Sequence, residues 1–300
     1  MDIAVTGASG LIGSALTKRL GASGHRVLRL VRRDPLGSDE AGWRPQEGYV
    51  DSESLEGIGA VVHLAGAGVG ERRWSADRKQ LILHSRAAGT ELLATTLAQL
   101  GRPPDSFLSG SAIGYYGDRG DAVLDEASAP GNDFLAEVCA AWERATSAAR
   151  DAGVAVTLLR SGIVLSRNGG ALRRQLPFFR WGLGGRIGSG RQWQSWISLD
   201  DEVRAIEHLL DAAVEGPVNL TAPNPVTNSE FTKALGRVLH RPTSITPKFA
   251  LKLLYGSELT EALVGVSQRV APRALQRSGF RFLHPEIEPA LRHLLNRPAD

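Results

Sequence analysis

The stretch Gly7-Ala8-Ser9-Gly10-Leu11-Ile12-Gly13 joins a short apolar segment, residues 3–5, to a helix-like segment at residues 11–20. Strand, glycine turn and helix in this order are typical of a dinucleotide site, although the spacing is GxxGxxG and not the GxGxxG of many dehydrogenases. Gly7 permits a tight turn, Gly10 lets backbone amides approach a pyrophosphate, and Gly13 lets the helix lie close to the strand. The positive end of the helix then favours the phosphates. We therefore predict a dinucleotide site formed by Gly7, Ser9, Gly10, Leu11, Ile12 and Gly13.

The residues after the second predicted strand, 26–31, indicate the phosphate state of the cofactor. NAD sites place Asp or Glu there to accept a hydrogen bond from the ribose 2′-hydroxyl, whereas arginine attracts a 2′-phosphate. Here the strand is followed by Arg32 and Arg33. The pair predicts NADP(H), with both arginines at the 2′-phosphate. Two alternatives stay open: Asp34 permits NAD if the strand ends later, and the two arginines can be solvated loop charges.

The first half of the chain alternates short β-rich runs with longer helical patterns. This alternation predicts a parallel sheet with helices on both faces, and the apolar run at residues 60–65 suits a strand covered on both sides. Predicted strands are residues 3–6, 26–31, 49–51, 60–64, 106–109 and 154–159, and predicted helices are residues 11–21, 77–100 and 134–152. Ser75 is expected to cap the second helix. The fold class is α/β, a Rossmann-like doubly wound parallel sheet.

Three glycine-rich segments are predicted as loops. Residues 34–48 stand where a crossover helix is expected, residues 112–132 follow the strand 106–109, and residues 182–190 precede a tryptophan-rich run at 192–196. Ligands bind at the carboxyl edge of such sheets, so the second loop is expected over the binding crevice. We expect a NADP-binding Rossmann domain over residues 1–165. Residues 166–300 are expected to form a smaller mixed α/β domain on the substrate side, part of which can return to the first domain.

Composition and charge argue against several function classes. The chain has 300 residues, 42% of them hydrophobic, and 35 Lys and Arg against 32 Asp and Glu give a net charge of +3. The scattered basic residues argue against a nucleic-acid partner. No apolar run reaches the roughly 18 residues that a membrane span needs, and the N-terminus does not resemble a signal peptide. A lone cysteine, Cys139, fits a reducing compartment, so a cytoplasmic protein is expected. The seven histidines show no zinc-ligand spacing, and no metal is expected.

Further motifs resemble the extended short-chain dehydrogenase/reductase superfamily. They are His63-Leu64-Ala65-Gly66, Ser109-Gly110-Ser111, Ala112-Ile113-Gly114-Tyr115-Tyr116-Gly117, Leu159-Arg160-Ser161-Gly162, Gln192-Trp193-Gln194-Ser195-Trp196 and Gln268-Arg269-Val270-Ala271-Pro272. Together they are similar to the atypical "epimerase family" members, NAD-dependent epimerase/dehydratase-like proteins with a small C-terminal domain of the DUF1731 type. The resemblance covers essentially the whole chain. It implies cofactor contacts from Leu64, Ala65, Gly66, Ser109 and Arg160, and a substrate-orienting role for Ser111.

One departure from the superfamily affects the expected chemistry. The superfamily places a Tyr-x-x-x-Lys pair on the helix after the strand at 106–109, and the pair transfers a proton as hydride moves. The corresponding positions here are Leu135 and Cys139, and neither side chain can take the part of the tyrosine or the lysine in this proton transfer. We predict Ser111 and Tyr116 as catalytic residues, with Tyr115 as the other source of a phenol. The missing positive charge then has to come through space, from Lys79 or from one of three arginines, Arg72, Arg86 or Arg160.

The expected function is that of an NADP(H)-dependent oxidoreductase or epimerase-like enzyme. Its substrate is expected to be a small carbonyl, alcohol or sugar-nucleotide-like molecule. The alternative is a non-catalytic NADP(H)-binding redox sensor, which the missing Tyr-x-x-x-Lys pair favours. By analogy with extended members, a homodimer is expected to form through the helices 77–100 and 134–152. Trp193 and Trp196 are expected either to line the substrate pocket or to hold the domains together.

Overall fold

An eight-stranded sheet forms the centre of the computed structural model, which describes residues 1–70, 72–212 and 214–298. In spatial order its strands are β13 (Gly216–Leu220), β8 (Ala155–Ser161), β6 (Ser106–Ala112), β5 (Ala60–His63), β1 (Asp2–Thr6), β2 (Arg26–Val31), β3 (Glu40–Arg44) and β4 (Tyr49–Val50). Neighbouring strands run parallel, except that β4 is antiparallel to β3. This arrangement confirms the predicted fold class.

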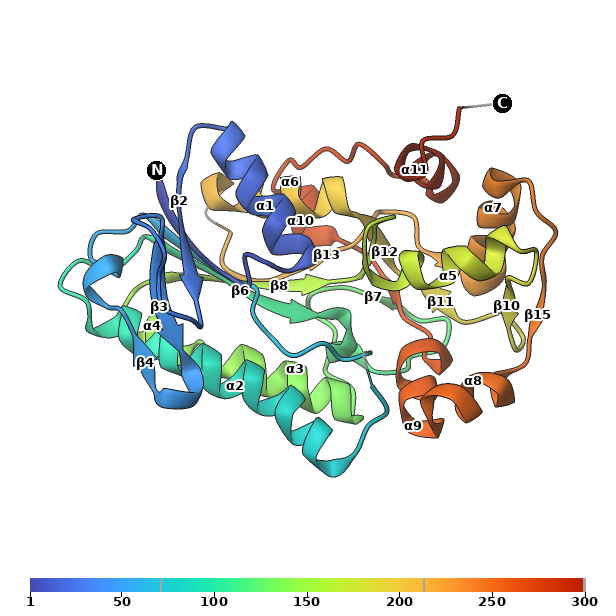
Figure 1. The fold of residues 1–300 in the computed structure, drawn as a ribbon, viewed down its shortest axis with the longest axis horizontal. Helices are drawn as coiled ribbons and strands as arrows, with labels where there is room; N and C mark the ends of the chain where they lie inside the picture. The colour runs from blue at the N-terminus through green and yellow to red at the C-terminus, as the bar shows by residue number, and fades with distance from the viewer. Residues whose placement is uncertain (71, 213, 299–300) are drawn as a thin grey trace.

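Helices cover both faces of the sheet (Figure 1). One face carries α1 (Leu11–Ala22), α6 (Leu199–Ala212) and α10 (Arg273–Arg277), and the other carries α2 (Ala76–Gln99), α3 (Phe134–Arg144) and α4 (Ser147–Asp151). In α1, Gly13, Leu16 and Leu20 are buried, because residues three and four apart lie on the same side of a helix. Ser75 caps α2 as predicted and accepts a hydrogen bond from the backbone N–H of Arg78. Across the described residues, none of the helices is both long and apolar enough to cross a membrane.

Residues 34–48 contain a strand, so the prediction of a continuous loop there is wrong. β3 pairs in parallel with β2 and buries Ala41 and Trp43. The carboxylate of Glu40 is buried as well, within 3.1 Å of two arginines. A charged residue at a buried position, with glycine and proline on both sides, hides this strand from a search for alternating apolar residues. Short 3-10 helices follow at Pro45–Glu47 and Glu53–Leu55.

The predicted helix 134–152 is divided into α3 and α4. Thr146 lies at the break, is fully buried, and donates a hydrogen bond to the carbonyl of Glu143 at 2.8 Å. A threonine hydroxyl bonded to a nearby carbonyl competes with the regular helical pattern. β6 and β8 extend beyond their predicted ends, to Ala112 and Ser161, because the two strands pair along their whole length.

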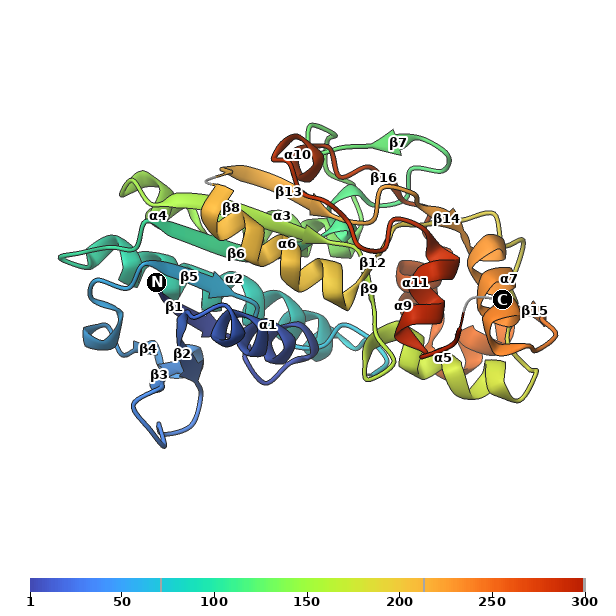
Figure 2. The same ribbon diagram turned by 90° about the horizontal axis from the view of Figure 1, so that it is seen from above.

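A smaller unit lies beside the carboxyl ends of β6 and β8 (Figure 2). Its helices are α5 (Gly170–Arg180), α7 (Asn228–Leu239), α8 (Lys248–Tyr255), α9 (Ser257–Thr260) and α11 (Ile287–Leu294), with a π-helical turn at Glu261–Gly265. Its strand pairs are β9 (Ile163–Leu165) with β12 (Trp196–Ser198), β10 (Gly185–Ile187) with β15 (Ser244–Thr246), and β11 (Trp193–Gln194) with β14 (Val226–Thr227). Leu172, Phe231 and Leu235 belong to its own hydrophobic core. The chain returns from this unit to the large sheet through α6 and β13.

The C-terminal part of the chain also reaches the loop after β6. β16 (Arg269–Val270) pairs with β7 (Val123–Leu124), which lies in that loop. The side-chain amide of Gln268 donates to the carbonyls of Ile113 and Gly117 at 3.0 and 3.1 Å. The hydroxyl of Ser267 donates to the carbonyl of Gly120 at 2.7 Å. The segment predicted as a loop at 112–132 therefore contains some regular secondary structure: a 3-10 helix at Ile113–Tyr116 and the strand β7.

Candidate functional site

The glycine turn between β1 and α1 forms a tight corner at the carboxyl edge of the sheet. Gly7 has a φ of +67°, and a Cβ there would lie 2.9 Å from the carbonyl carbon of Leu64. A Cβ at Gly13 would lie only 2.1 Å from the carbonyl oxygen of Gly7. Ser9 and Gly10 are exposed, and Gly10, at the N-cap, places no side chain over the first turn of α1. The backbone N–H groups of that turn have no partner within the helix, and they and the helix dipole can hold a phosphate.

Thr6 fixes the turn after β5 beside this corner. Its Oγ1 accepts hydrogen bonds from the backbone N–H groups of Leu64 and Ala65, at 3.1 and 3.2 Å, and lies 2.7 Å from Nδ1 of His63. His63 is fully buried, and desolvation lowers the pKa of its imidazole to about 3. Leu64 and Ala65 are half-buried and Gly66 is exposed. This run therefore lines the same edge of the sheet as the glycine turn.

The two arginines after β2 have different environments. Arg33 donates to both carboxylate oxygens of Glu40 at 2.7 Å and to the carbonyl of Asp34 at 2.8 Å. The hydrogen bonds from Arg33 lower the pKa of the Glu40 carboxyl to about 2, so this pair stays ionised. Arg32 is exposed, and its side chain makes no ion pair or hydrogen bond with the described residues. Arg32 is therefore the member of the pair whose positive charge is not compensated.

A buried ionic network lies behind the ends of β6 and β8. The Arg160 guanidinium donates to both carboxylate oxygens of Glu143 at 2.8 Å and to the Tyr116 hydroxyl at 3.0 Å. The Ser111 hydroxyl donates to Glu143 at 2.6 Å, and the Tyr116 hydroxyl donates to the side chain of Asn219 at 2.7 Å. All five side chains are buried. The network holds Ser111 in one orientation through a carboxylate that Arg160 neutralises.

Tyr116 does not lie in the open crevice where we expected it. Its side chain is fully buried, and desolvation raises the pKa of its hydroxyl to about 12. Tyr115 is only half-buried, and its hydroxyl makes no hydrogen bond with the described residues. The Arg160 guanidinium lies 3.5 Å from the centre of the Tyr115 ring. Ser109 is also fully buried, so the side chains of Ser109 and Arg160 face the interior and not the edge at which Gly66 is exposed.

Helix α3 presents Leu135 and Cys139 to the loop that carries the two tyrosines. A Cβ at Gly114 in that loop would lie 3.4 Å from Cβ of Leu135 and 3.6 Å from Sγ of Cys139. Cys139 is buried, and desolvation raises the pKa of its thiol to about 12. This face of α3 therefore offers the loop an alkyl group and a neutral thiol.

Arg86 of α2 places a positive charge behind Gly66. Its Nη1 donates to the carbonyls of Ala67 and Ile82, at 2.9 and 3.2 Å, and its guanidinium lies 5.0 Å from the centre of the Trp142 ring. A Cβ at Gly66 would lie 3.1 Å from Cζ of Arg86. Within the described ranges, no carboxylate lies at ion-pair distance from Arg86. Burial lowers the pKa of Arg86, but a guanidinium keeps its charge in proteins.

The tryptophans after the third glycine-rich segment join separate parts of the chain. Trp196 is fully buried, and its indole N–H donates to the carbonyl of Asn224 at 3.2 Å. The indole N–H of Trp193 donates to the carboxylate of Asp121 at 2.9 Å. Of the two roles expected for them, these contacts favour holding the structure together.

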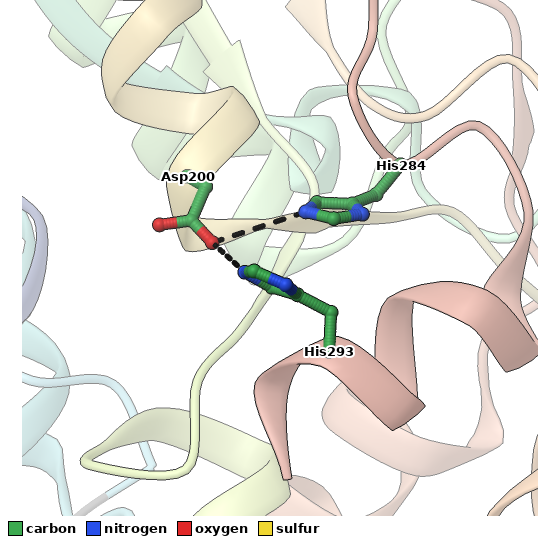
Figure 3. Close-up of side chains that lie close together, drawn as sticks. All are labelled: Asp200, His284 and His293. Atoms are coloured by element: carbon green, nitrogen blue, oxygen red, sulfur yellow. Dashed lines mark hydrogen bonds and ion pairs between the residues drawn. The ribbon is translucent and has the colours of Figure 1, made fainter. Parts of the chain in front are cut away.

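A cluster that no sequence motif indicated lies at the start of α6. Asp200 lies beside His284 and His293 (Figure 3), and one ligand atom from each residue lies within 4.8 Å of the others. Asp200 lies more than 80 residues before the two histidines, so no local spacing in the sequence could reveal the cluster. The carboxylate of Glu143, which positions Ser111, was not among the predicted site residues either.

Comparison with known proteins shows which families this chain matches. Residues 3–221 match the model of the NAD dependent epimerase/dehydratase family, and residues 246–294 match the domain of unknown function DUF1731. The epimerase family protein Mb2239 of Mycobacterium bovis is 47% identical over 298 residues, which cover 99% of this chain and 98% of the relative. The chloroplastic SDR39U1 homologue of Arabidopsis thaliana is 39% identical, with 98% of this chain and 87% of the relative covered.

A solved structure shows the same fold at full length. The crystal structure of human epimerase family protein SDR39U1 (isoform 2) with NADPH is 33% identical to this chain, covers 99% of both chains, and has a TM-score of 0.91. A structure of MoeE5 with UDP-glucuronic acid and NAD, 22% identical, covers 99% of this chain and 98% of MoeE5 at a TM-score of 0.77 and shows the fold alone. The chain therefore belongs to the NAD-dependent epimerase/dehydratase family, and within it to the SDR39U1-like epimerase family proteins that carry a C-terminal DUF1731 domain.

Proposed function

We propose that this protein binds NADP(H) at the carboxyl edge of the sheet, with the diphosphate on the turn between β1 and α1. The observation that carries the proposal is the start of α1, where Ser9 and Gly10 are exposed and no side chain caps the first backbone N–H groups of the helix. A Cβ at Gly7 or Gly13 would collide with backbone atoms, so both positions require glycine. Dinucleotide sites need glycine at these positions for the tight turn and for the close packing of helix on strand. The NADPH in the human relative supports the same ligand for this chain.

Arg32 is proposed to give the preference for the 2′-phosphate. Its guanidinium is exposed and unpaired within the described chain, whereas Arg33 is held by Glu40. Arginine binds phosphate through charge and paired N–H donors. Arg33 then acts mainly through Glu40, by fixing the backbone from which Arg32 projects.

The cofactor proposal is tested by titrating the purified protein with NADPH and NADH under identical conditions. We expect NADPH to bind more tightly, and Arg32→Ala to raise the Kd for NADPH at least tenfold while leaving that for NADH nearly unchanged. Lys233→Ala, an exposed charge on α7, is the control for the loss of one positive charge. No saturable binding of either nucleotide would refute the site. Equal effects of Arg32→Ala on both nucleotides would refute the role of Arg32 alone.

We further propose that the protein is an oxidoreductase or epimerase-like enzyme acting on a small carbonyl, alcohol or sugar-nucleotide-like substrate. When bound, NADP(H) supplies or accepts hydride. Leu135 and Cys139 stand at the positions of the superfamily's Tyr-x-x-x-Lys pair, and neither can exchange a proton with a substrate oxygen at neutral pH. Tyr115 has the free hydroxyl on the facing loop, so it is the better candidate for this exchange. Tyr116, fully hydrogen-bonded inside the protein, is better placed to position Arg160.

Ser111 and Arg86 supply two further elements of this proposal. The Ser111 proton is committed to Glu143, so its oxygen is left to accept a hydrogen bond, which suits the hydroxyl of an alcohol substrate. Arg86 lies behind Gly66 and has no carboxylate partner among the residues that the structure describes. Its charge would favour negative charge that develops on a substrate oxygen at this edge of the sheet.

The catalytic proposal is tested by following NADPH consumption over a panel of small aldehydes, ketones and keto-sugars. Removing a group that transfers a proton costs about 10²–10⁴-fold in rate. We therefore expect Tyr115→Phe to lower kcat by this order while NADPH affinity is kept, and Ser111→Ala to raise KM and lower kcat. The folded fraction of Tyr116→Phe should keep a kcat within a few-fold of that of the unchanged protein. Loss of activity in Tyr116→Phe but not in Tyr115→Phe would reverse the assignment.

A second candidate function is a non-catalytic NADP(H)-dependent sensor. The observation that favours it is the face of α3 toward the tyrosine loop, which carries the alkyl group of Leu135 and the neutral thiol of Cys139. Tight NADPH binding without turnover of any substrate, together with a partner whose affinity differs between NADPH and NADP⁺, would support this function. Turnover that depends on Tyr115 would exclude it.

A further inference from the structure

A cluster of two imidazoles and one carboxylate joins the start of α6 to the C-terminal segment. Asp200 lies in the first turn of α6, His284 lies between α10 and α11, and His293 lies on α11. Oδ2 of Asp200 lies 3.1 Å from Nε2 of His293 and 3.9 Å from Nε2 of His284. Figure 3 shows both rings turned toward this one oxygen. The ring centres are 4.4 Å apart with planes 33° apart, so the two nitrogens approach the carboxylate side by side.

The donor atoms match a transition-metal site in kind and in spacing. Two imidazole nitrogens and a carboxylate oxygen suit Zn²⁺ and neighbouring divalent metals, whereas Ca²⁺ and Mg²⁺ prefer sites made of oxygen. Bonds of about 2.0–2.1 Å in a tetrahedron put ligand atoms about 3.3 Å apart. The distances from Asp200 of 3.1 and 3.9 Å bracket that value, so small side-chain movements would complete the geometry.

Residues around the cluster hold His284 in place. The carboxylate of Asp201 accepts hydrogen bonds from the backbone N–H groups of Leu283 and His284, both at 2.8 Å. The loop that carries His284 is thereby tied to the residue next to Asp200. The His284 side chain is only 13% exposed, and its Nε2 is buried without a hydrogen-bond partner in the described residues. Such a nitrogen is costly to leave unpaired, and a bound cation would satisfy it.

The remaining two ligands keep the cluster accessible. Asp200 and His293 are 47% and 58% exposed, so an ion can reach the site from solvent and can keep water as a further ligand. We propose that Asp200, His284 and His293 bind one divalent transition-metal ion, with Zn²⁺ the best fit. The ion would clamp α11 of the smaller unit to α6 of the large sheet.

The test uses the untagged full-length protein, treated with a chelator and titrated with ZnCl₂ by calorimetry. We expect saturable binding of one Zn²⁺ per chain and a rise in Tm on adding Zn²⁺. Co²⁺ should give the visible absorption of a nitrogen- and oxygen-ligated site. His293→Ala should weaken binding at least tenfold and abolish the rise in Tm. Asp200→Asn should do the same.

His84→Ala, an exposed histidine on α2, is the matched control and should bind Zn²⁺ as the unchanged protein does. Circular dichroism shows whether each variant is folded. His293 is exposed, so its replacement should leave the fold intact and keep the test valid even if other variants misfold. The proposal is overturned if the protein does not bind Zn²⁺ at a 1:1 ratio. It is overturned equally if His293→Ala and His84→Ala bind with the same Kd.

Discussion

Arg160 of β8 and Glu143 of α3 form a double hydrogen-bonded ion pair inside the protein, with two N···O distances of 2.8 Å. The pair links the sheet to the helix that covers it, and Glu143 also holds the Ser111 hydroxyl. The pair therefore couples the orientation of a candidate substrate-binding group to the stability of the fold.

Replacing Glu143 with Gln should destabilise the protein strongly. Arg160 is 3% exposed and would keep its charge without a counterion. Breaking one side of such a buried pair costs about 3–5 kcal/mol. Urea unfolding would measure the loss, with Glu91→Gln, an exposed glutamate on α2, as the control expected to stay within about 0.5 kcal/mol. Similar midpoints for the two variants would contradict the importance of the pair.

The two adjacent tyrosines should respond differently to loss of the hydroxyl. Tyr116→Phe leaves Oδ1 of Asn219 and one N–H of Arg160 unpaired in the interior, at a cost of about 1–3 kcal/mol. Tyr115→Phe breaks no hydrogen bond within the described chain and should change stability by less than about 0.5 kcal/mol. Thermal unfolding of the two variants side by side measures this difference. Equal shifts in Tm would show that the Tyr116 hydroxyl is not held as described.

Alanine at Gly13 should damage the glycine turn, whereas alanine at Gly21 in the same helix should not. A Cβ at Gly13 would lie 2.1 Å from the Gly7 carbonyl oxygen, but a Cβ at Gly21 meets nothing within 4 Å. We expect Gly13→Ala to cost about 1–3 kcal/mol, as overpacking does, and to weaken NADPH binding. Gly21→Ala should be neutral or stabilise by up to about 1 kcal/mol, because alanine is the better helix former. Chemical unfolding measures the stability of both variants, and nucleotide titration measures their affinity for NADPH. Equal values for the two variants would contradict the prediction.

The buried imidazole of His63 should make stability depend on pH below neutrality. The folded protein holds its pKa at about 3, whereas the unfolded chain takes up a proton near pH 6.5. The unfolded state therefore binds more protons between these values, and stability falls as the pH drops below about 6.5, by up to about 1.4 kcal/mol per pH unit. His63→Asn removes this contribution.

Urea unfolding at pH 7.5, 6.5 and 5.5 measures the effect of His63. The unchanged protein should lose about 1.4 kcal/mol more than His63→Asn over this range. The comparison concerns the slope with pH, so a constant destabilisation of the variant does not affect it. Parallel profiles would show that His63 does not titrate in this way.

The sequence predicted the parts of the fold that depend on local patterns. The glycine turn, the capped helix α2 and the buried strand β5 each have a signature within ten or so residues. β3 was missed because its buried Glu40 is neutralised by Arg29 and Arg33, which lie beyond the reach of an alternating pattern. The break between α3 and α4 depends on a buried Thr146, and burial is a tertiary property.

Residues of the candidate site could be predicted only where they lie close to one another in the sequence. Ser111 could be placed near the carboxyl end of β6 and the two tyrosines on the segment that follows it, but which tyrosine is buried depends on Asn219 and Arg160 from other strands. The pairing of Asp200 with His293 spans 93 positions in the chain and arises only when α11 reaches α6. Contacts of this kind require the folded structure.

The strand pairing between β7 and β16 has a consequence for how the molecule forms during synthesis. The loop that bears Tyr115 is held by Ser267 and Gln268, which emerge from the ribosome some 150 residues later. The large sheet can begin to fold early, but the loop over its edge lacks the hydrogen bonds to Ser267 and Gln268 until the chain is almost finished. A nascent or prematurely terminated chain would therefore lack these hydrogen bonds to the loop of Tyr115, and a DUF1731 segment taken from a relative would have to supply them again.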